Sequence, residues 1–287
     1  MPELPEVETI ARGLDAAIRG RTIARVDVWW GRTVDSRSEP IERLVGDTIA
    51  SVGRVGKFVI IGLTSGRTLA VHLRMTGRLT VADRGTAAAV DRKGRPLPDL
   101  SKGRPLREPS KHERFALVFR DGGRLAFSDA RKFGRVRLID GDVARALDVG
   151  IDALALGAAS LRALLARRTT RIKTFLLDQR RIGGVGNIYA NEALFRARVH
   201  PKRRAGKLTA LQRTRLLREL RAVLRSAIAS RGSSVDDYVD AEGMPGEFQK
   251  LLKVYGRAGL PCRRCRTPIK RIVLGQRGTF YCPACQR

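Results

Sequence analysis

All four cysteines of this 287-residue chain lie in its C-terminal segment, and their spacing restricts the local fold more than any other feature. They form two Cys-x-x-Cys pairs separated by sixteen residues. The four residues are Cys262, Cys265, Cys282 and Cys285. Two such pairs supply the thiolates of a tetrahedral zinc site. Strand-like runs at 269–274 and 279–282 flank a turn at 275–278, which predicts a zinc ribbon.

The predicted ribbon holds one structural Zn²⁺ ion, because four thiolates leave no open coordination position. Its expected task is to aim the hairpin tip, where Arg277 lies. Two disulfides are the other interpretation, and they fit poorly with a cytoplasmic chain.

The first ten residues, MPELPEVETI, place an amine beside carboxylates. Removal of Met1 would leave Pro2 as a free secondary amine, and an α-amino group titrates near about 8. Glu3 adjoins this amine, and Glu6 follows one helical turn later. Pro5 suits the first turn of a helix, where carboxylates are also favoured. By themselves, these residues are most simply the entrance of a capped helix.

The charge balance points to a polyanionic partner. Lys and Arg total 57 against 28 Asp and Glu, a net charge of +29, and nucleic acid is the first candidate. An anionic membrane surface, ribosomal RNA or a GC-rich genome would also account for the excess. No apolar run is long enough for a transmembrane helix. The acidic start does not resemble a signal peptide, so we expect a cytoplasmic protein.

Hydrophobic periodicity divides the chain into a β-rich half and a helical half. Apolar residues at 3, 4 and 3 spacing predict a first helix at 5–19. Strand-like segments follow at 22–30, 48–55, 58–63, 68–73, 115–119, 124–127 and 136–139. A helix followed by many antiparallel strands indicates a two-layer β-sandwich or barrel. Residues 81–110, rich in proline and charge, predict a long insertion between strands.

The second half carries helical spacing after about residue 141. The predicted helices are 160–168, 171–179, 188–198, 209–230 and 246–254. The glycines of RIGGVGNIYANE, at 181–192, allow close backbone approach, and Asn187 begins a helix whose free N–H groups can bind phosphate. A tight connection between helices is the other interpretation of these glycines.

Three residues of the first half suggest DNA contacts. Lys57 opens an apolar strand, a position where lysine is usually solvated, so its functional interpretation needs a reaction that uses a cation. Met75 and Phe133 lie near loops beside arginines, as do apolar wedges that enter a base stack. Either residue alone is also compatible with a core position.

Eight motifs in order resemble the formamidopyrimidine-DNA glycosylase family of bacterial glycosylase/AP lyases for oxidised purines. They are PELPEVET, the Gly56-Lys57 step, HLRMTG, KHERF, DARKFG, GGVGNIYANEALF, VYGRAG and the cysteine tail. The resemblance spans the chain, interrupted mainly at the 81–110 insertion. It implies an α+β multidomain fold: an N-terminal helix plus two-layer β-sandwich at 1–140, a helix–two-turn–helix domain at 141–256 and a zinc ribbon at 257–287.

The resemblance also implies catalytic roles. Pro2 would attack C1′ of the damaged nucleoside and form a Schiff base. Glu3 would be the general acid in sugar-ring opening, with Glu6 as a supporting carboxylate. Lys57 would serve β-elimination, and Arg277 would contact phosphate and assist the δ-elimination.

For DNA handling, the family pattern assigns Met75, Arg131 and Phe133 to the void left by the everted base, with Arg131 facing the orphaned cytosine. The implied phosphate contacts are His112, Lys173, Asn187 and Arg168. The implied partner is damaged double-stranded DNA, bound by a monomer, with no membrane association. Residues 239–247 match a loop that covers the everted base.

Two residues depart from the family pattern. Arg74 stands where the family commonly has glycine, and Lys132 stands where a second arginine is usual. Lysine lacks the planar bidentate donors of arginine. The insertion at 81–110 is also longer than the family pattern leads us to expect.

Two other functions remain open at the level of sequence. The nearer one is an endonuclease VIII-like enzyme for oxidised pyrimidines, which shares the fold and the nucleophile. Leu4-Pro5 and the complete set of three wedge residues favour the purine enzyme. The more distant one is a non-catalytic zinc-ribbon protein that binds nucleic acid through charge.

Overall fold

The computed structural model describes residues 1–82, 111–235, 238–240 and 243–287. Most of the predicted insertion at 81–110 therefore lies outside the described residues. The described chain forms two compact units. Unit 1 contains Met1–Pro2, Glu6–Ala146 and Ser233–Gly246, and unit 2 contains Glu3–Pro5, Leu147–Gly232 and Glu247–Arg287.

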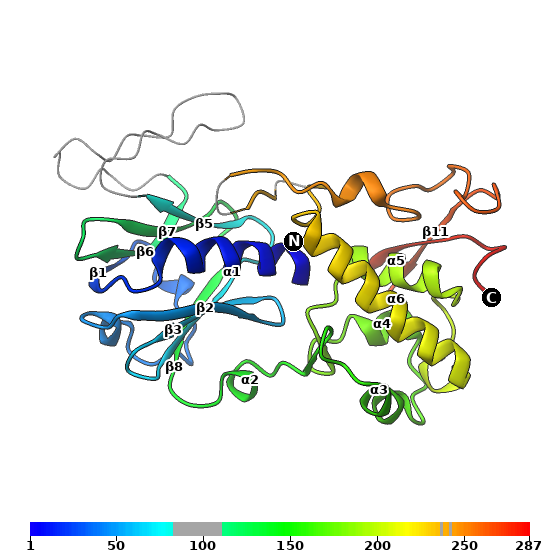
Figure 1. The fold of residues 1–287 in the computed structure, drawn as a ribbon, viewed down its shortest axis with the longest axis horizontal. Helices are drawn as coiled ribbons and strands as arrows, with labels where there is room; N and C mark the ends of the chain where they lie inside the picture. Colours follow the sequence, from blue (N-terminus) through cyan, green and yellow to red (C-terminus); the bar gives the residue numbers. More distant parts are fainter. Residues whose placement is uncertain (83–110, 236–237, 241–242) are drawn as a thin grey trace. The chain divides into compact units, whose positions relative to one another are not determined.

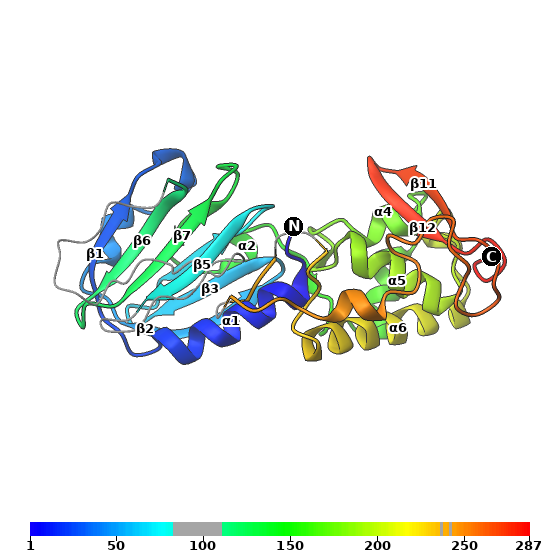
Figure 2. The ribbon, with the colours of Figure 1, turned by 90° about the horizontal axis from the view of Figure 1, so that it is seen from above.

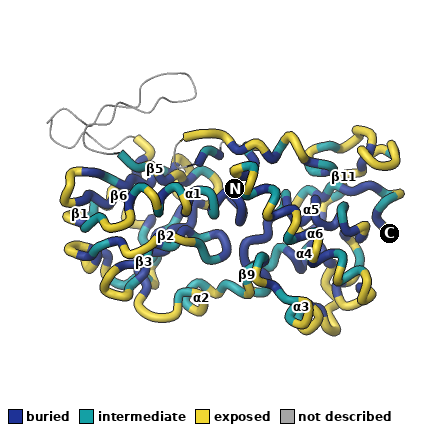
Figure 3. The backbone as a smooth tube through the Cα atoms, viewed as in Figure 1, coloured by how far each residue is buried: buried dark blue, intermediate teal, exposed yellow. Residues whose placement is uncertain are grey.

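Unit 1 is built on two four-stranded antiparallel sheets. Its strands are β1 (Ile23–Val28), β2 (Ile49–Val55), β3 (Phe58–Leu63), β4 (Thr68–His72), β5 (Gly77–Ala82), β6 (Glu113–Phe119), β7 (Arg124–Asp129) and β8 (Arg135–Ile139). One sheet has the order β1-β6-β7-β5 and the other β2-β3-β4-β8. Figure 3 marks the buried stretches of these strands in dark blue. The predicted β-sandwich is confirmed.

Helix α1 (Leu4–Ile18) runs along one edge of the two sheets (Figures 1 and 2). Its Val7, Ile10 and Leu14 are buried in one cluster with side chains of both sheets. The apolar spacing therefore predicted the correct face of this helix, because residues three and four apart share one side. The described part of this unit also contains three short helices: η1 (Gly31–Thr33), η2 (Ile41–Leu44) and α2 (Val143–Ala146).

Unit 2 is mainly helical and ends in a β-hairpin. Its helices are α3 (Ala158–Leu165), α4 (Ile172–Leu176), η3 (Ala205–Lys207), α5 (Asn187–Ala197), α6 (Ala210–Ala229) and η4 (Phe248–Leu251). Its strands are the short parallel pair β9 (Ile151–Asp152) and β10 (Ile182–Gly183), and the hairpin β11 (Lys270–Leu274) and β12 (Arg277–Tyr281). Buried side chains of α3, α4, α5 and α6 form one core.

Several predicted helix boundaries are corrected by hydrogen bonds made outside the helices. Residues 246–254 form only the 3₁₀ helix η4, because the N–H groups that follow it donate to the Glu192 carboxylate instead of to the preceding turn. Helix α4 ends at Leu176, where the chain turns and the side chain of Gln179 bonds to Val185. Strand β5 was not predicted at all.

Among the described residues, no helix combines the length and the apolar character that crossing a membrane requires.

Candidate active site

In unit 2, the Glu3 carboxylate binds the first turn of helix α5. One of its oxygens accepts the Ile188 N–H at 2.9 Å, and the other accepts the Tyr189 N–H at 3.3 Å. The N-cap residue is Gly186, which has no side chain to fill this role. Glu3, 4% exposed, therefore caps the helix from a distant part of the sequence, and the helix dipole stabilises its negative charge.

Two glycines make this approach possible. A Cβ atom on Gly186 would overlap the carboxyl group of Glu3, and one on Gly184 would lie 2.6 Å from Leu4 Cδ1. Gly184 also has a φ of +96°, which other residues rarely adopt, and its carbonyl accepts the Leu4 N–H at 3.1 Å. The glycines of the 181–192 segment thus receive the N-terminal residues of the chain.

Lys173 fixes the cysteine-bearing hairpin to the helices. It is 0% exposed, and its ammonium donates to the Gly278 carbonyl at 3.0 Å and to the Thr279 hydroxyl at 2.8 Å. Burial lowers the pKa of Lys173 to about 8; the charge of Glu3 opposes this shift, and that of Arg277 adds to it. Lys173 is therefore a buried anchor of strand β12.

Helix α5 is the second attachment of the hairpin. Asn187 donates its side-chain amide to the Gly278 carbonyl at 3.1 Å, and the Asn191 side chain accepts the Phe280 N–H at 2.8 Å. Glu192, fully buried, accepts three successive backbone N–H groups, those of Lys253, Val254 and Tyr255. Asn191 and Glu192 were not among the predicted site residues, although polar residues on a buried helical face were a usable signal.

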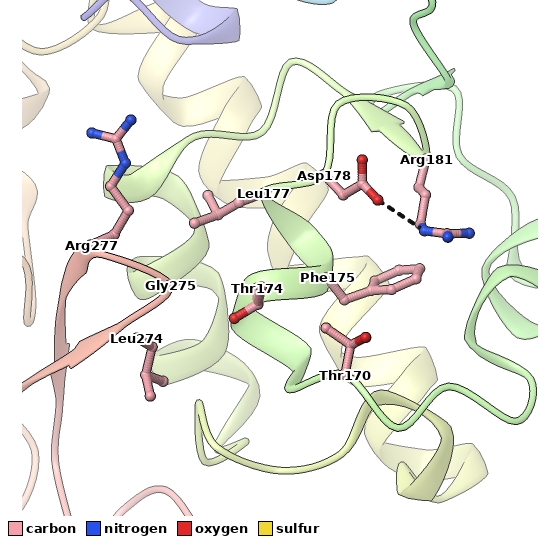
Figure 4. Close-up of a pocket in the computed structure, with 9 residues that line it drawn as sticks. All are labelled: Thr170, Thr174, Phe175, Leu177, Asp178, Arg181, Leu274, Gly275 and Arg277. Atoms are coloured by element: carbon pink, nitrogen blue, oxygen red, sulfur yellow. Dashed lines mark hydrogen bonds and ion pairs between the residues drawn. The ribbon is translucent and has the colours of Figure 1, made fainter.

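Arg277 is exposed at the start of β12, directly after a two-residue turn. Gly275 and Gln276 both have positive φ, at 55° and 58°, as type I′ hairpin turns require. A pocket of about 390 Å³ lies beside this turn and α4 (Figure 4). Its lining residues are Thr170, Thr174, Phe175, Leu177, Asp178, Arg181, Leu274, Gly275 and Arg277.

The four cysteines form a compact cluster, as predicted. Their sulfur atoms all lie within 4.8 Å of one another. The Cys265 Sγ lies 3.4 Å from those of Cys282 and Cys285, far beyond a disulfide bond. Tetrahedral thiolates at about 2.3 Å from zinc lie about 3.8 Å apart. The donor set is therefore compatible with one structural Zn²⁺ ion.

In unit 1, Glu6 is buried and bound from two sides. It is 2% exposed, one oxygen of its carboxylate accepts the Ser233 N–H at 2.8 Å, and its backbone carbonyl accepts the Tyr238 hydroxyl at 3.4 Å. Pro2 is also buried in this unit. The segment that contains Ser233 and Tyr238 thus packs against the first helix.

Lys57 occupies the two-residue turn between β2 and β3. Gly56 takes a φ of +58°, and Lys57 is 7% exposed. The charge of Lys57 acts electrostatically on His72. The Nδ1 atom of His72 accepts the Arg74 N–H at 3.0 Å. Burial, together with the charges of Arg74 and Lys57, lowers the pKa of His72 to about 3. His72 is therefore neutral at physiological pH.

Met75, Arg131 and Phe133 come together at two adjacent loops of unit 1. Met75 is 45% exposed and Phe133 49% exposed. The Arg131 guanidinium lies between them, with Nη1 3.3 Å from Met75 Sδ and its central carbon 4.9 Å from the Phe133 ring centroid. Two exposed apolar side chains that gather around an arginine form a candidate binding surface.

The remaining predicted contact residues, His112 and Arg168, are both exposed. His112 lies in unit 1, where its carbonyl accepts the Asp129 N–H at 2.8 Å. Arg168 lies in unit 2 beyond the end of α3, and its guanidinium donates to the Leu164 carbonyl at 3.3 Å. Both side chains are therefore accessible to an anionic ligand.

Comparison with known families gives three matches in order along the chain. Residues 1–136 match the formamidopyrimidine-DNA glycosylase N-terminal domain, and residues 149–239 match the formamidopyrimidine-DNA glycosylase H2TH domain. Residues 259–287 match the zinc finger found in FPG and IleRS.

Whole-chain comparisons point the same way. The chain is 44% identical over 294 residues to a formamidopyrimidine-DNA glycosylase of Chloroflexus aggregans, covering 100% of this chain and 98% of that protein. A Lactococcus lactis FPG variant in complex with Fapy-dG-containing DNA superposes with a TM-score of 0.84 at 32% identity, covering 100% of both chains. A complex of Lactococcus lactis Fpg with abasic-site DNA superposes with a TM-score of 0.83 at 32% identity, covering 99% of each chain.

Proposed function

This chain belongs to the formamidopyrimidine-DNA glycosylase family, and from that membership we propose that it excises oxidised purines from duplex DNA and cleaves the resulting abasic site. The substrates would be 8-oxoguanine and formamidopyrimidines. The activity is base-excision repair by a bifunctional glycosylase and AP lyase. The net charge of +29 supports a polyanionic substrate.

The proposed nucleophile is the Pro2 amine, freed by loss of Met1. The amine attacks C1′ of the damaged nucleoside, and the bond from C1′ to the base breaks. Opening of the sugar ring then gives an iminium ion between Pro2 and the sugar. This cation withdraws electrons and so acidifies the proton on C2′; loss of that proton gives an enamine, which expels the 3′ phosphate in β-elimination.

One observation carries the proposal: helix α5 binds the Glu3 carboxylate, and Glu3 follows Pro2 directly in the sequence. A general acid for sugar-ring opening must be fixed in direction, and the Ile188 and Tyr189 N–H groups supply that fixation. The same two groups stabilise the carboxylate that remains once the proton has been donated. We therefore assign the acid role to Glu3.

Lys57 and Arg277 serve the elimination steps in this proposal, and Glu6 supports the site. Lys57 lies in a tight turn and is 7% exposed, so its backbone is held by the short connection between β2 and β3. Arg277 is exposed on the hairpin, where a guanidinium can bind a phosphate. Glu6 orders the Ser233 segment through its hydrogen bond.

We assign Met75, Arg131 and Phe133 to the space left by the everted base. Their exposure and mutual contact suit side chains that enter a base stack, and flipping costs only a few kcal/mol at a damaged pair. His112, Asn187 and Arg168 are the proposed phosphate contacts, together with Lys173. Because Lys173 is fully buried, it would reach a phosphate only if the hairpin moved, and its role in the described state is to hold β12.

A bound zinc ion would stabilise the fold of the ribbon and take no part in catalysis, because four thiolates complete its coordination. The residues that would hold it are the four cysteines of the cluster. We also propose that the protein acts as a monomer in the bacterial cytoplasm. Sedimentation in the presence and absence of duplex DNA would test the oligomeric state.

Borohydride trapping tests the proposed chemistry most directly. Borohydride reduction of a mixture of the protein and an 8-oxoguanine-containing duplex should link the protein to the DNA through Pro2. Peptide mapping would locate the linked residue. A protein that retains Met1 should not be trapped, because an amide nitrogen cannot form the iminium. Glu3→Gln should lose base excision yet keep binding to an abasic analogue.

Two outcomes would support the other functions. Clear preference for thymine glycol over 8-oxoguanine would indicate the pyrimidine-directed enzyme. The absence of any adduct from a zinc-loaded, DNA-binding protein would indicate a non-catalytic binding module.

A further inference from the structure

Asp129 ends strand β7 inside unit 1, at the base of the loops that carry the three exposed side chains described above. Asp129 is 1% exposed, so water does not stabilise the charge of its carboxylate. A buried carboxylate is costly unless several donors satisfy it. Its donors therefore identify what it does.

Those donors come from both loops. One oxygen of Asp129 accepts the Thr76 hydroxyl and, at 3.2 Å, the Arg131 N–H. The other oxygen accepts the Gly134 N–H at 2.6 Å. Thr76 follows Met75 directly, whereas Arg131 and Gly134 enclose Phe133. One carboxylate thus joins the loop after β4 to the loop after β7.

The connection is closed by a third hydrogen bond and by close packing. The Thr76 hydroxyl accepts the same Arg131 N–H at 3.2 Å, so each loop bonds both to the carboxylate and to the other loop. A Cβ atom on Gly134 would overlap the Phe127 ring, and one on Gly77 would lie 2.8 Å from that ring. Both loops therefore pack closely against the Phe127 ring, which fixes their positions relative to each other.

We propose that Asp129 is a positioning residue that couples the two loops, so that Met75, Arg131 and Phe133 enter the DNA as one rigid group. The proposal rests on the proposed function, in which these three side chains fill the void and Arg131 faces the orphaned base. Asp129 itself does not touch the DNA. It sets where the Arg131 guanidinium lies relative to Met75 and Phe133.

The test is the ratio of excision rates for 8-oxoguanine opposite cytosine and opposite adenine. Asp129→Asn keeps the shape of the side chain but places an amide donor against donors from the loops. The rate opposite cytosine should fall by about tenfold to a hundredfold, because a small displacement of a reading group has a large effect. The cytosine-to-adenine ratio should fall with it.

The ratio separates positioning from general damage. Partial unfolding lowers the active fraction and scales both rates equally, leaving their ratio unchanged. Borohydride trapping on a single-stranded abasic oligonucleotide, which has no opposite base, should stay within about twofold of the wild type. Asp121→Asn is the matched control, since Asp121 bonds a backbone N–H at the turn before β7.

A second pair of variants keeps the test decisive if Asp129→Asn does not fold. Thr76→Val removes the hydroxyl that joins the loops and should lower the ratio, whereas Thr76→Ser should restore it. Equal loss of both rates, or a ratio like that of the wild type in Thr76→Val, would overturn the positioning role. A wild-type protein that neither excises 8-oxoguanine nor traps would instead refute the proposed function.

Discussion

Gly186 lies so close to Glu3 that a Cβ atom on the glycine would overlap the carboxyl carbon. The overlapping atoms belong to the end of a side chain, so Gly186→Ala should displace Glu3 and leave the helix in place. We expect excision of 8-oxoguanine to fall by about a hundredfold, because the acid loses its position. The free energy of unfolding should fall by only about 1–3 kcal/mol. Single-turnover excision and urea unfolding measure the two effects.

Gly157→Ala is the matched control for this variant. Gly157 is also an N-cap glycine, at helix α3, and an added Cβ would meet nothing nearer than the Ser160 Oγ at 3.8 Å. Excision should be unchanged. Equal losses in the two variants would mean that glycine is required at the N-cap for a reason unrelated to Glu3.

Arg74→Gly should stabilise the protein. Arg74 has a φ of +54°, a left-handed conformation that costs side chains about 1–2 kcal/mol, whereas glycine loses about 0.5–1 kcal/mol of chain entropy. A net gain of up to about 1 kcal/mol should be visible by urea unfolding. The same change at Arg78, inside strand β5, should destabilise. A loss of stability in Arg74→Gly would show that its side-chain contacts outweigh the backbone strain.

His72 should make the protein sensitive to mild acid. The pKa of His72 is lowered to about 3 in the folded chain, against 6.5 in the unfolded chain, so the unfolded state binds more protons between these values. The contribution of neutral His72 to the free energy of unfolding is therefore complete above pH 6.5 and is lost as the pH drops toward 3. The contribution falls by at most about 1.4 kcal/mol per pH unit.

His72→Asn isolates this effect, because asparagine can accept the Arg74 N–H yet does not titrate. The difference in unfolding free energy between wild type and variant should be constant above pH 6.5 and shrink below it. The groups that face His72 are Phe58, Arg74 and Lys57. A difference that stays flat down to pH 4.5 would contradict the prediction.

Zinc removal should release the hairpin. A chelator, or Cys265→Ser, removes a ligand from the cluster, and structural zinc sites contribute folding free energy directly. Lys173 and Asn187 would then lose their partners on β12. We expect one zinc released per chain, a lower Tm and loss of strand cleavage. Chelator preloaded with zinc is the control, and a chain that carries no zinc when purified would rule out the site.

Local signals predicted the elements whose partners are near in sequence. Helix α6 was predicted within one residue at each end from its helical spacing, and the structure adds a capping box of Thr209 and Gln212 at its start. The cysteine cluster was likewise predicted from spacing. Residues 246–254 were wrongly predicted as a helix, since their N–H groups bind Glu192, some sixty residues earlier.

The site could be predicted only as separate motifs. Glu3 and Gly186 are far apart in sequence, so no local pattern reveals that one must be glycine to admit the other. Asp129 was present in the DARKFG motif, but its burial and its bonds to Thr76 depend on how two loops meet. Strand β5, which pairs with β7, was missed although its first residues alternate between buried and exposed positions.

Helix α5 holds the C-terminal hairpin through Asn187 and Asn191 and the segment leading to it through Glu192. The simplest exchange of zinc ribbons between relatives would cut the chain in the linker before Cys262. Such a graft would separate the ribbon from the residues of α5 that bind it. Because α5 also belongs to the core that it shares with α3, α4 and α6, the ribbon is transferable only to a recipient that presents matching residues on α4 and α5, and a tail graft without them should not keep its fold.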